Sequence, residues 1–439
     1  MRPVTLVAAV LVALSSSVSA EESVQQTTQA LLPEITAWRR DLHEHPELSN
    51  REVRTSKFVA GELKKLGYDV RTGIAKTGVT GTMKFGKPGP KLAIRADMDA
   101  LPVTEDVDLP FKSVAKGEYS GKTVGVMHAC GHDAHTAMTL GVAEAIAKRK
   151  NELSGEVMFI FQPAEEGAPP GEEGGAPLMV KDGVFRDFKP DAVIGMHVIS
   201  TLNVGTVSVR EGGAMASSDT FRIVVHGRQS HGAMPWKGVD PIVTAADIVM
   251  SAQTIVSREL DLNANPAVVT FGVFNGGERF NIVPDKAVLD GTVRTFDETM
   301  RRQALTSLAR IAQNVAEAHG ATVDLEIPKP GADPFHSNPV NYNDPALTKR
   351  VRASLVTANG ADNVSEAERW MASEDFPQLG NSVPAPSVYF IIGATPKGQD
   401  AKTAPSNHSP KFFLDEGALA VGTQSMLQVA IDYLGGGGS

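Results

Sequence analysis

The chain has 439 residues, with 42 Lys and Arg against 51 Asp and Glu, so its formal net charge is −9. A hydrophobic fraction of 42% with 21% charged residues is typical of a folded globular protein and excludes a largely disordered chain. Because binding to nucleic acid depends on clustered Lys and Arg, the acidic balance and the absence of a long basic run exclude a nucleic-acid partner.

The first 20 residues are predicted to be a signal peptide. Arg2 gives a positive start, residues 4–14 are apolar apart from one Thr, and Val18 and Ala20 stand where a signal peptidase reads the chain. The apolar run is shorter than the roughly 20 residues that span a bilayer, so we expect export to a periplasm or beyond, with no membrane association after cleavage. The alternative is a buried N-terminal helix. Residues 435–439 read GGGGS, resemble a flexible linker and are set aside.

Strand and helix patterns alternate over the first half of the chain. They predict a helix at 50–66, a strand at 91–96, a helix at 132–150, and strands at 155–161 and 192–195. Buried strands that alternate with helices predict an α/β fold, a mainly parallel sheet covered on both faces. Ligands of such sheets bind beyond the carboxyl ends of the strands.

The pattern changes after residue 212. The prediction there is a strand at 220–225, a helix at 241–260, strands at 267–274 and 286–296, a helix at 298–319 and a strand at 322–327. Asp297 is placed to cap the second helix and Gly320 to end it. The order β-α-β-β-α-β is that of a ferredoxin-like unit.

The α/β pattern resumes after this unit, with a helix at 344–355, a strand at 387–392 and a helix at 415–434. We therefore predict a discontinuous domain, residues 21–212 and 328–434, with a smaller domain at 213–327 inserted into it. Two or three domains also agree with about 150 residues per domain.

Three separate segments carry metal-ligating residue types. Cys130 and His132 are two residues apart in HACGHDAH, so both can point the same way from an extended loop. Thiolate and imidazole suit Zn²⁺, Co²⁺, Ni²⁺ or Mn²⁺. A turn before a helix is the alternative for this motif. Since Cys130 is the single cysteine, an internal disulfide is excluded.

The other two segments follow predicted strands. Glu165 and Glu166 come after the strand at 155–161, and adjacent carboxylates allow one to bind metal while the other handles protons. His197 follows the strand at 192–195. A solvated acidic loop and a structural histidine are the respective alternatives. Donors at successive strand ends together favour a metal site.

These residues match a family. The chain resembles the dinuclear-metal amidohydrolases and exopeptidases of the aminoacylase/carboxypeptidase type, and within them the hippurate hydrolases and plant indole-acetyl-amino-acid hydrolases. The resemblance covers about residues 30–435. Nine motifs in order carry it: RADMDALP (Arg95–Pro102), HACGHDAH (His128–His135), QPAEE (Gln162–Glu166), GMH (Gly195–His197), SHGAMP (Ser230–Pro235), FNGGERFNIVPD (Phe274–Asp285), TVRTFD (Thr292–Asp297), SEDF (Ser373–Phe376) and NHSP (Asn407–Pro410).

The resemblance implies two divalent metal ions, Mn²⁺, Zn²⁺, Co²⁺ or Ni²⁺, and a set of five ligands. Glu166 and His408 would hold one ion and His132 and His197 the other, with Cys130 between them.

The resemblance also assigns roles around the metal ligands. Glu165 would be the general acid/base and Asp99 would orient a ligand. Distant relatives carry a ligating His where Asp97 stands, so that role is not transferred to Asp97. Asp133 and His135 are expected beside the ligands or at the start of the helix.

The resemblance gives the inserted domain a share in the site, as a lid and dimerisation domain. His231 would polarise the scissile carbonyl of the partner subunit in a homodimer. Asn281 and Arg294 would hold a substrate carboxylate, since the Arg fork matches carboxylate oxygens. A surface strand residue is the alternative for Arg294. Glu374 is expected to bind substrate, and with Asp375 to line the site.

We therefore expect an exported metal-dependent amidohydrolase that cleaves the amide of N-acyl or N-aroyl amino acids. The alternatives are a dipeptidase or carboxypeptidase that uses the same site, or a periplasmic metal- or ligand-binding protein without catalysis. Gly212-Gly213 and Gly276-Gly277 suit turns or hinges between the domains.

Overall fold

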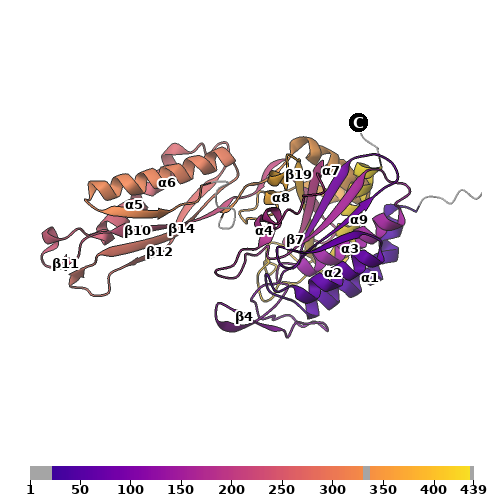
Figure 1. Ribbon diagram of the computed structural model, residues 1–439, viewed down its shortest axis with the longest axis horizontal. Coiled ribbons are helices and arrows are strands. Elements are labelled where there is room, and N and C mark those ends of the chain that lie inside the picture. Colours follow the sequence, from indigo (N-terminus) through magenta and orange to yellow (C-terminus); the bar gives the residue numbers. More distant parts are fainter. Residues whose placement is uncertain (1–21, 330–336, 436–439) are drawn as a thin grey trace, which may run out of the picture.

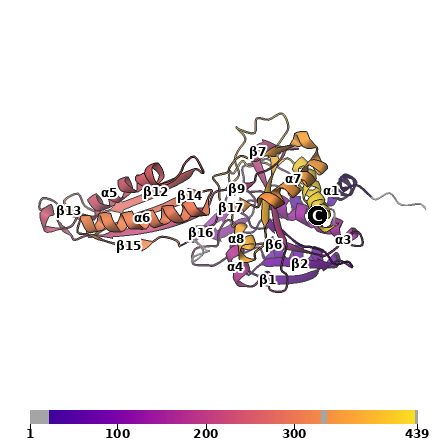
Figure 2. The ribbon, with the colours of Figure 1, turned by 90° about the horizontal axis from the view of Figure 1, so that it is seen from above.

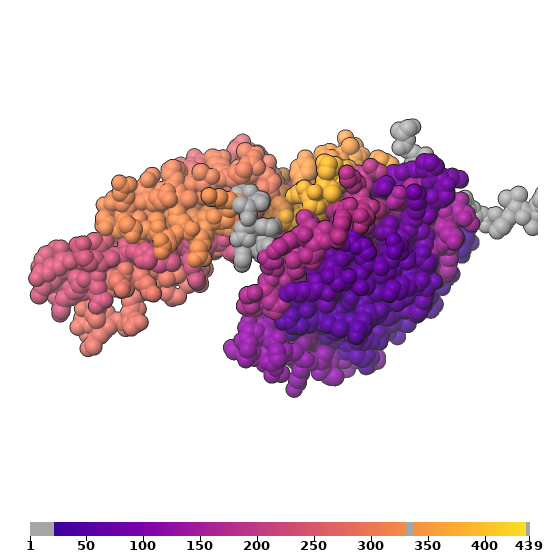
Figure 3. All heavy atoms as spheres, in the orientation of Figure 1, coloured from indigo at the N-terminus to yellow at the C-terminus, as the bar shows by residue number. Residues whose placement is uncertain are grey.

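A computed structural model describes residues 22–329 and 337–435. It has two lobes joined at one end, and the smaller lobe extends away from the larger one (Figures 1 and 3). The predicted signal peptide, and residues 436–439 of the predicted linker, lie outside the described residues. No helix in the described ranges is long and apolar enough to cross a membrane.

The larger lobe is built around one eight-stranded sheet. Its strands follow the order β1 (Asp69–Ile74), β2 (Gly78–Lys84), β6 (Glu156–Gln162), β3 (Lys91–Asp97), β7 (Ala192–Asn203), β19 (Ser387–Thr395), β8 (Val207–Val209) and β18 (Val364–Glu366). The four central strands β6, β3, β7 and β19 are parallel neighbours. Their carboxyl ends therefore meet at the same edge of the sheet.

Helices cover both faces of this sheet. One face carries α1 (Val24–Glu44), α2 (Val53–Lys65), α3 (His132–Lys148), α7 (Pro345–Asn359) and α9 (Gly417–Leu434), and the other carries α4 (Gly175–Lys181) and α8 (Pro377–Ser382). Side chains alternate between the two cores along each strand. On β3, Leu92 and Ile94 enter the first core, whereas Ala93 enters the second.

The smaller lobe has its own sheet and its own core. The sheet order is β12 (Ala267–Gly276), β14 (Lys286–Thr295), β10 (Ser218–His226) and β15 (Thr322–Glu326), with α5 (Pro241–Thr254) and α6 (Glu298–Ala318) packed on it. In chain order these six elements read β-α-β-β-α-β. Asp297 caps α6 through the backbone N–H groups of Thr299 and Met300, and Gly320 follows that helix with φ +70°.

Short strands serve the ends of the smaller lobe. The far tip carries β11 (Ser230–His231) and β13 (Ile282–Val283), which pair with each other (Figures 1 and 2). Next to the larger lobe, β9 (Gly212–Met215) pairs with β17 (Asn341–Asn343), and β16 (Ser337–Asn338) pairs with β10. The hairpin β4 (Lys116–Tyr119) and β5 (Lys122–Gly125) belongs to the larger lobe.

The predicted mainly parallel sheet is confirmed, with antiparallel pairing between β1 and β2, β2 and β6, and β8 and β19. The structure corrects other sequence-based expectations. Strand β7 continues well past the predicted end at residue 195. Helix α1 was not predicted, because Pro33 lies inside it and Pro disfavours helix interiors. The helix predicted over 241–260 gives way after Thr254 to a π-helical turn, Ile255–Glu259.

Candidate metal centre

Potential metal ligands gather at the carboxyl edge of the four central parallel strands. Asp97 ends β3, Glu165 and Glu166 follow β6, and Cys130 lies directly before α3. His197 was predicted to follow a strand. It lies inside β7 instead, because β7 continues for several residues beyond it. The edge geometry still brings its ring to the same place.

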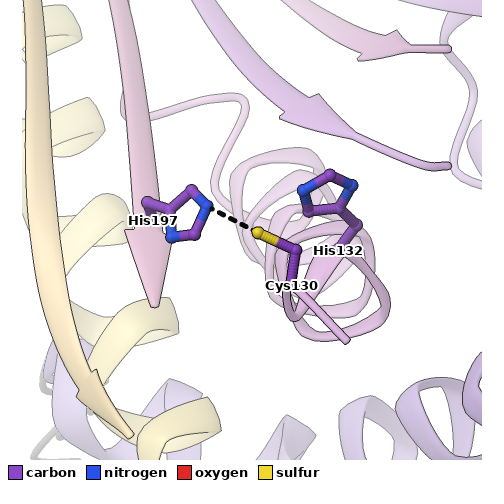
Figure 4. A group of neighbouring side chains, drawn as sticks. All are labelled: Cys130, His132 and His197. Atoms are coloured by element: carbon purple, nitrogen blue, oxygen red, sulfur yellow. Dashed lines mark hydrogen bonds between the residues drawn. The ribbon is translucent and has the colours of Figure 1, made fainter. Parts of the chain in front are cut away.

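Cys130, His132 and His197 form the innermost part of the cluster. Figure 4 shows the Cys130 thiol, just before α3, pointing to His197 on β7, with His132 at the start of α3 beside Cys130. The Cys130 Sγ lies 3.3 Å from the Nε2 of His197, and one ligand atom from each of the three residues lies within 4.8 Å of the others. All three residues are buried.

A second group contains Cys130, Glu166 and His408, whose ligand atoms also lie within 4.8 Å of one another. The Nε2 of His408 is 3.1 Å from a carboxylate oxygen of Glu166. His408 has φ +71°, a conformation that non-glycine residues rarely adopt and that is concentrated at functional sites. Cys130 is thus a member of both groups.

Hydrogen bonds determine which ring nitrogen of His132 and of His197 faces the cluster. The Nδ1 of His132 lies 2.9 Å from the carbonyl oxygen of Asp99 and 3.2 Å from its carboxylate. The Nδ1 of His197 lies 2.6 Å from the carbonyl oxygen of Val198. Because both Nδ1 atoms face acceptors, each can hold a proton there, and Nε2 is the nitrogen that each ring directs to the cluster.

The donor set fits a cation. The Nε2 of His132 is buried with no hydrogen-bond partner among the described residues, and it lies 3.9 Å from the Glu166 oxygen that faces His408. Burial alone would lower the pKa of His132, but the charges of Asp97, Asp99 and Glu166 outweigh burial and raise it to about 10. Sulfur, imidazole and carboxylate donors with excess negative charge suit a divalent transition-metal ion.

Asp99 touches two of the candidate ligands at once. Besides its contact with His132, it accepts hydrogen bonds from the backbone N–H of Glu166 at 3.1 Å and from the Ser49 hydroxyl at 2.8 Å. Asp99 thus contacts the ring of one candidate ligand and the backbone of another.

Glu165 lies beside the cluster. One of its oxygens is 3.8 Å from the Nε2 of His132, and its carboxylate oxygens also come within 4.8 Å of those of Glu374 and Asp375. Burial, followed by the charges of these neighbouring carboxylates, raises the pKa of Glu165 well above its usual range. Glu165 is therefore a carboxyl group that can exchange a proton beside the candidate ligands.

A buried arginine that was not predicted organises this side of the site. Arg95 donates to Asp97 at 2.6 Å, to Glu374 at 2.8 Å and to Asp375 at 3.1 Å, and its side chain has no exposed surface. It also donates to Gln162 at 2.9 Å. The guanidinium offsets part of the negative charge that gathers next to Glu165.

Glu374 lines the cavity that opens over the cluster, and both of its carboxylate oxygens already accept hydrogen bonds from other side chains. One of its oxygens accepts from Arg95 and the other accepts from the Tyr389 hydroxyl at 2.9 Å. Its side chain is 1% exposed. The carboxylate therefore supports the buried network, and Asp375, which accepts from Gln162 at 2.7 Å and from the backbone N–H of Ala176, does the same.

Glu52 is a second residue that sequence reasoning missed. It is fully buried and accepts from the backbone N–H of Ala164 at 2.9 Å and from the Thr77 hydroxyl at 2.6 Å. Ala164, which precedes Glu165, has φ +51°. Glu52 thus holds the strained residue that aims Glu165.

The neighbours expected around α3 take different roles. The Nδ1 of His135 lies 2.6 Å from Asp97, and its Nε2 accepts from the backbone N–H of Val198 at 2.9 Å, so both ring nitrogens are used. Asp133 faces away from the cluster and contacts Arg39 and His43. Both residues therefore brace the segment that carries Cys130 and His132.

The predicted substrate residues of the smaller lobe separate into two places. Arg294, on β14, reaches the larger lobe and donates to the carbonyl oxygen of Met371 at 3.3 Å. His231 and Asn281 lie together at the far tip, where the Asn281 carbonyl accepts from Gly232 at 2.8 Å (Figure 1). Within one chain the structure therefore does not bring Asn281 beside Arg294, nor His231 beside the cluster.

A cavity of about 280 Å³ opens over the cluster, and we call it the Trp370 cavity. Its walls include Cys130, Glu165, Glu166, His197, Ile199, Thr201, Met215, Trp370 and His408. The Trp370 ring meets the His197 ring edge to face, with 5.5 Å between the ring centroids. The cavity thus joins apolar walls to the candidate ligands.

The comparisons with known proteins agree with this geometry. Residues 93–432 match the family described as Peptidase family M20/M25/M40. Thermostable carboxypeptidase 1 of Saccharolobus solfataricus is 38% identical over 405 residues, which are 91% of this chain and 96% of that protein. The N-acetylcysteine deacetylase of Bacillus subtilis is 37% identical over 397 residues, 90% of this chain and 96% of that protein.

A solved structure extends the likeness to the fold. The Bacillus subtilis YXEP protein, described as a dinuclear metal binding peptidase from the M20 family, superposes with a TM-score of 0.75 at 34% identity. The match covers 92% of this chain and 99% of that one. The likeness includes both lobes.

Proposed function

This chain belongs to peptidase family M20/M25/M40, a family of metal-dependent hydrolases of amide bonds, and we propose that it cleaves N-acyl amino acids to a carboxylic acid and a free amino acid. One observation carries the proposal. Five sulfur, nitrogen and oxygen donors converge beside Glu165. Arg294, which forms no ion pair among the described residues, contacts Met371 next to the Trp370 cavity.

The proposed ligands divide between two divalent ions. Glu166 and His408 would hold one ion, His132 and His197 the other, and Cys130 would hold both. The membership of Cys130 in both ligand groups supports this division, as does the description of the YXEP protein as a dinuclear metal binding peptidase. When bound, such ions lower the pKa of water and polarise a carbonyl group.

The chain's own residues supply the proton transfers and the positioning. Glu165 accepts a proton from the attacking water and donates it to the leaving nitrogen. Asp99 fixes the orientation of His132 and the backbone of Glu166. Glu52 holds the loop that carries Glu165.

The proposed substrate has a free carboxylate on its leaving half. Arg294 is half-buried and, among the described residues, forms no ion pair, so burial lowers the pKa of its guanidinium. A substrate carboxylate would supply the missing partner. The Bacillus relative acts on an N-acetyl amino acid, whereas the Saccharolobus relative is a carboxypeptidase. Peptides with a free carboxyl end are therefore the second candidate substrate.

We also propose that the functional unit is a homodimer in which His231 of one subunit serves the cluster of the other. The distance of the β11 tip from the cluster within one chain supports this arrangement (Figure 1). The edge strand β12 adds support, because it exposes Val273 (38%) and Phe274 (44%). Exposed apolar edge strands favour pairing with another chain. Asn281, at the same tip, would reach the partner's substrate together with His231.

Export is the remaining part of the proposal. The charge, length and apolar run of residues 1–20 support it. Cell fractionation, with N-terminal sequencing of the recovered protein, tests it. A processed protein that starts after Ala20 in the periplasm or medium is the expected result, and an unprocessed cytoplasmic protein would contradict export.

Chelation and metal restoration test the activity. Protein treated with a chelator should lose hydrolysis of hippurate and N-acetyl amino acids, and Mn²⁺, Zn²⁺, Co²⁺ or Ni²⁺ should restore it. The Cys130 thiol should become protected from alkylation as activity returns. Dipeptides and C-terminal peptides belong in the same panel, because faster turnover of them would favour the carboxypeptidase alternative. Restored metal binding without turnover of any amide would support a binding protein instead.

A further inference from the structure

A second cavity shares Glu166 with the Trp370 cavity. It has a volume of about 110 Å³ and lies between the β4 strand, residues 100–102 and the loop that follows Glu166. Its apolar lining consists of Leu48, Ala100, Leu101, Pro102, Tyr119 and Pro169, and its polar lining includes Ser49, Arg51, Glu118 and Glu166. We call it the Tyr119 cavity. Glu166 lines both cavities, so the two meet at a candidate metal ligand.

We infer that the two halves of the substrate divide between these cavities, with the amino-acid half in the Trp370 cavity and the acyl half in the Tyr119 cavity. The inference rests on the proposed hydrolysis of N-acyl amino acids. The inference goes beyond that reaction, because it states how the substrate is oriented in the site and which residues select the acyl group.

The position of Glu165 gives the first argument. A general acid that protonates the leaving nitrogen has to come within hydrogen-bond reach of it, about 2.6–3.2 Å. Glu165 lines the Trp370 cavity and, among the described residues, is not part of the Tyr119 lining. The leaving amino acid therefore belongs on the Trp370 side of the scissile bond.

The arginines give the second, independent argument. Arg294 contacts Met371, the neighbour of Trp370, and has no carboxylate partner among the described residues. Arg51, at the rim of the Tyr119 cavity, already donates two hydrogen bonds to Glu172, the shorter at 2.5 Å, and Lys76 pairs with the same carboxylate. Only the Trp370 side thus offers a free guanidinium to the carboxylate of an amino acid.

The lining of the Tyr119 cavity defines the acyl group. Leu48 is 6% exposed and bridges to Ala100, and the Tyr119 ring packs against this small apolar cluster. The Ser49 hydroxyl is already bound to Asp99. A cavity of this volume, with these apolar side chains beside Arg51, Glu118 and Glu166, selects a short uncharged acyl chain or a single ring and disfavours a fused bicyclic acyl group.

Two substrate series and two cavity variants test the inference. One series varies the acyl group on alanine, from acetyl through benzoyl to naphthoyl, and the other varies the amino acid under an acetyl group, from alanine to phenylalanine. Tyr119→Ala should raise the naphthoyl-to-acetyl ratio of kcat/KM by about tenfold or more and leave the phenylalanine-to-alanine ratio within about twofold. Thr201→Trp, which fills the Trp370 cavity, should lower the phenylalanine-to-alanine ratio and leave the acyl ratio unchanged.

Control variants distinguish an effect on the Tyr119 cavity from an effect on the β4–β5 hairpin that forms part of its wall. Tyr119→Phe keeps the ring and should keep both ratios. Val124→Ala removes a neighbour of Tyr119 in the hairpin cluster without lining the cavity, and it should also keep both ratios. A change with Val124→Ala equal to that of Tyr119→Ala would attribute the effect to the hairpin and overturn the inference.

Equilibrium binding of both series to the Glu165→Gln protein, measured by calorimetry, gives a readout independent of turnover. The ratios of Kd should move as the ratios of kcat/KM do. If Tyr119→Ala changes the phenylalanine-to-alanine ratio instead, the amino-acid half of the substrate occupies the Tyr119 cavity and the orientation is the reverse of the one inferred. If neither ratio changes, the Tyr119 cavity is not a subsite. Absence of turnover in the wild type, with the expected binding ratios, would contradict the proposed function and leave the orientation standing.

Discussion

The two lobes hold their polar functional residues in opposite ways. In the larger lobe three of the five candidate ligands, Cys130, His132 and His197, are buried, Glu166 is partly buried and His408 is exposed. The residues that support them, such as Asp99 and Arg95, are held by several hydrogen bonds each. At the tip of the smaller lobe, His231 is exposed and lies far from the cluster. The first arrangement is complete within one chain, and the second is not.

This difference shows that the residues that need exact positions lie in one lobe, whereas a residue proposed to contact another subunit lies in the other lobe. A cation site requires donors placed to within a fraction of an ångström, and a close-packed parallel sheet with a shared edge supplies that rigidity. A residue that meets the substrate from another subunit needs a projecting arm, and the smaller lobe, with its separate core, forms such an arm. Five measurements test this contrast.

Replacement of Glu165 by Gln should have the largest effect, since it removes the group proposed to move the proton. We expect kcat to fall by about 10²–10⁴-fold while the protein keeps its full metal content, measured by elemental analysis. Glu173→Gln is the matched control, because Glu173 lies on the same loop and pairs with Lys181 at the surface. Full turnover by a metal-loaded Glu165→Gln protein would remove Glu165 from the chemistry.

His231→Ala tests whether the smaller lobe acts across a dimer. We expect kcat to fall by about 10²–10³-fold, as for the loss of one donor to a developing oxyanion. His226→Ala is the control, because His226 is another exposed histidine of the same lobe, paired with Asp324.

Mixing the two inactive proteins decides the geometry. When His231→Ala and Glu165→Gln subunits exchange, half of the sites in each mixed dimer combine an intact Glu165 with an intact His231. Random pairing should therefore restore activity at about a quarter of all sites. No recovery after proven subunit exchange would mean that each chain uses its own His231.

Asp99→Asn tests how far the larger lobe depends on its supporting contacts. The variant weakens the hold on His132 and on the Glu166 backbone, so we expect metal affinity to fall by about 10–100-fold, measured by competition with a chelator. Asp219→Asn is the contrasting change, since Asp219 is equally buried but pairs with Arg301 in the smaller lobe. It should lower stability and leave metal affinity unchanged. An unchanged affinity in Asp99→Asn would contradict the orienting role.

The same contrast explains how much the sequence could predict. The central strands, the helices α3 and α6 and the candidate ligands follow from local patterns, such as apolar runs that end in Asp97 or precede Glu165. Helix α1 does not, since Pro33 interrupts its pattern and tertiary packing of Ile35 and Trp38 stabilises it instead.

Residues whose contacts lie far away in the sequence also cannot be predicted from local patterns. Glu52 is separated from Ala164 by 112 positions and from Thr77 by 25, and no neighbouring motif marks it. Arg95 stands inside RADMDALP, so the motif contained it, but its role depends on Glu374 and Asp375, 279 and 280 positions away. The place of Asn281 relative to Arg294 is likewise a property of the lobes and not of the motifs.

The smallest expected effect is a pH dependence of stability that arises behind the metal centre. The Nδ1 of His43 lies 2.8 Å from Asp133 and its Nε2 lies 3.2 Å from Glu105. Arg39 and His128 are the other charged or titratable groups that face this network. Burial lowers the pKa of His43, but the charge and hydrogen bond of Asp133, with the hydrogen bond of Glu105, outweigh it, so the pKa lies above 6.5.

A raised folded-state pKa stabilises the protein fully below the unfolded-state value, about 6.5, and this contribution disappears as the pH rises through the folded-state value. The free energy of unfolding of the wild type should therefore exceed that of His43→Gln most at acidic pH, and the gap should narrow above pH 6.5, as followed by urea denaturation. His226→Gln, which breaks an exposed pair in the smaller lobe, should give a nearly constant and small difference. A gap for His43→Gln that widened with pH would show that the buried network favours the neutral imidazole.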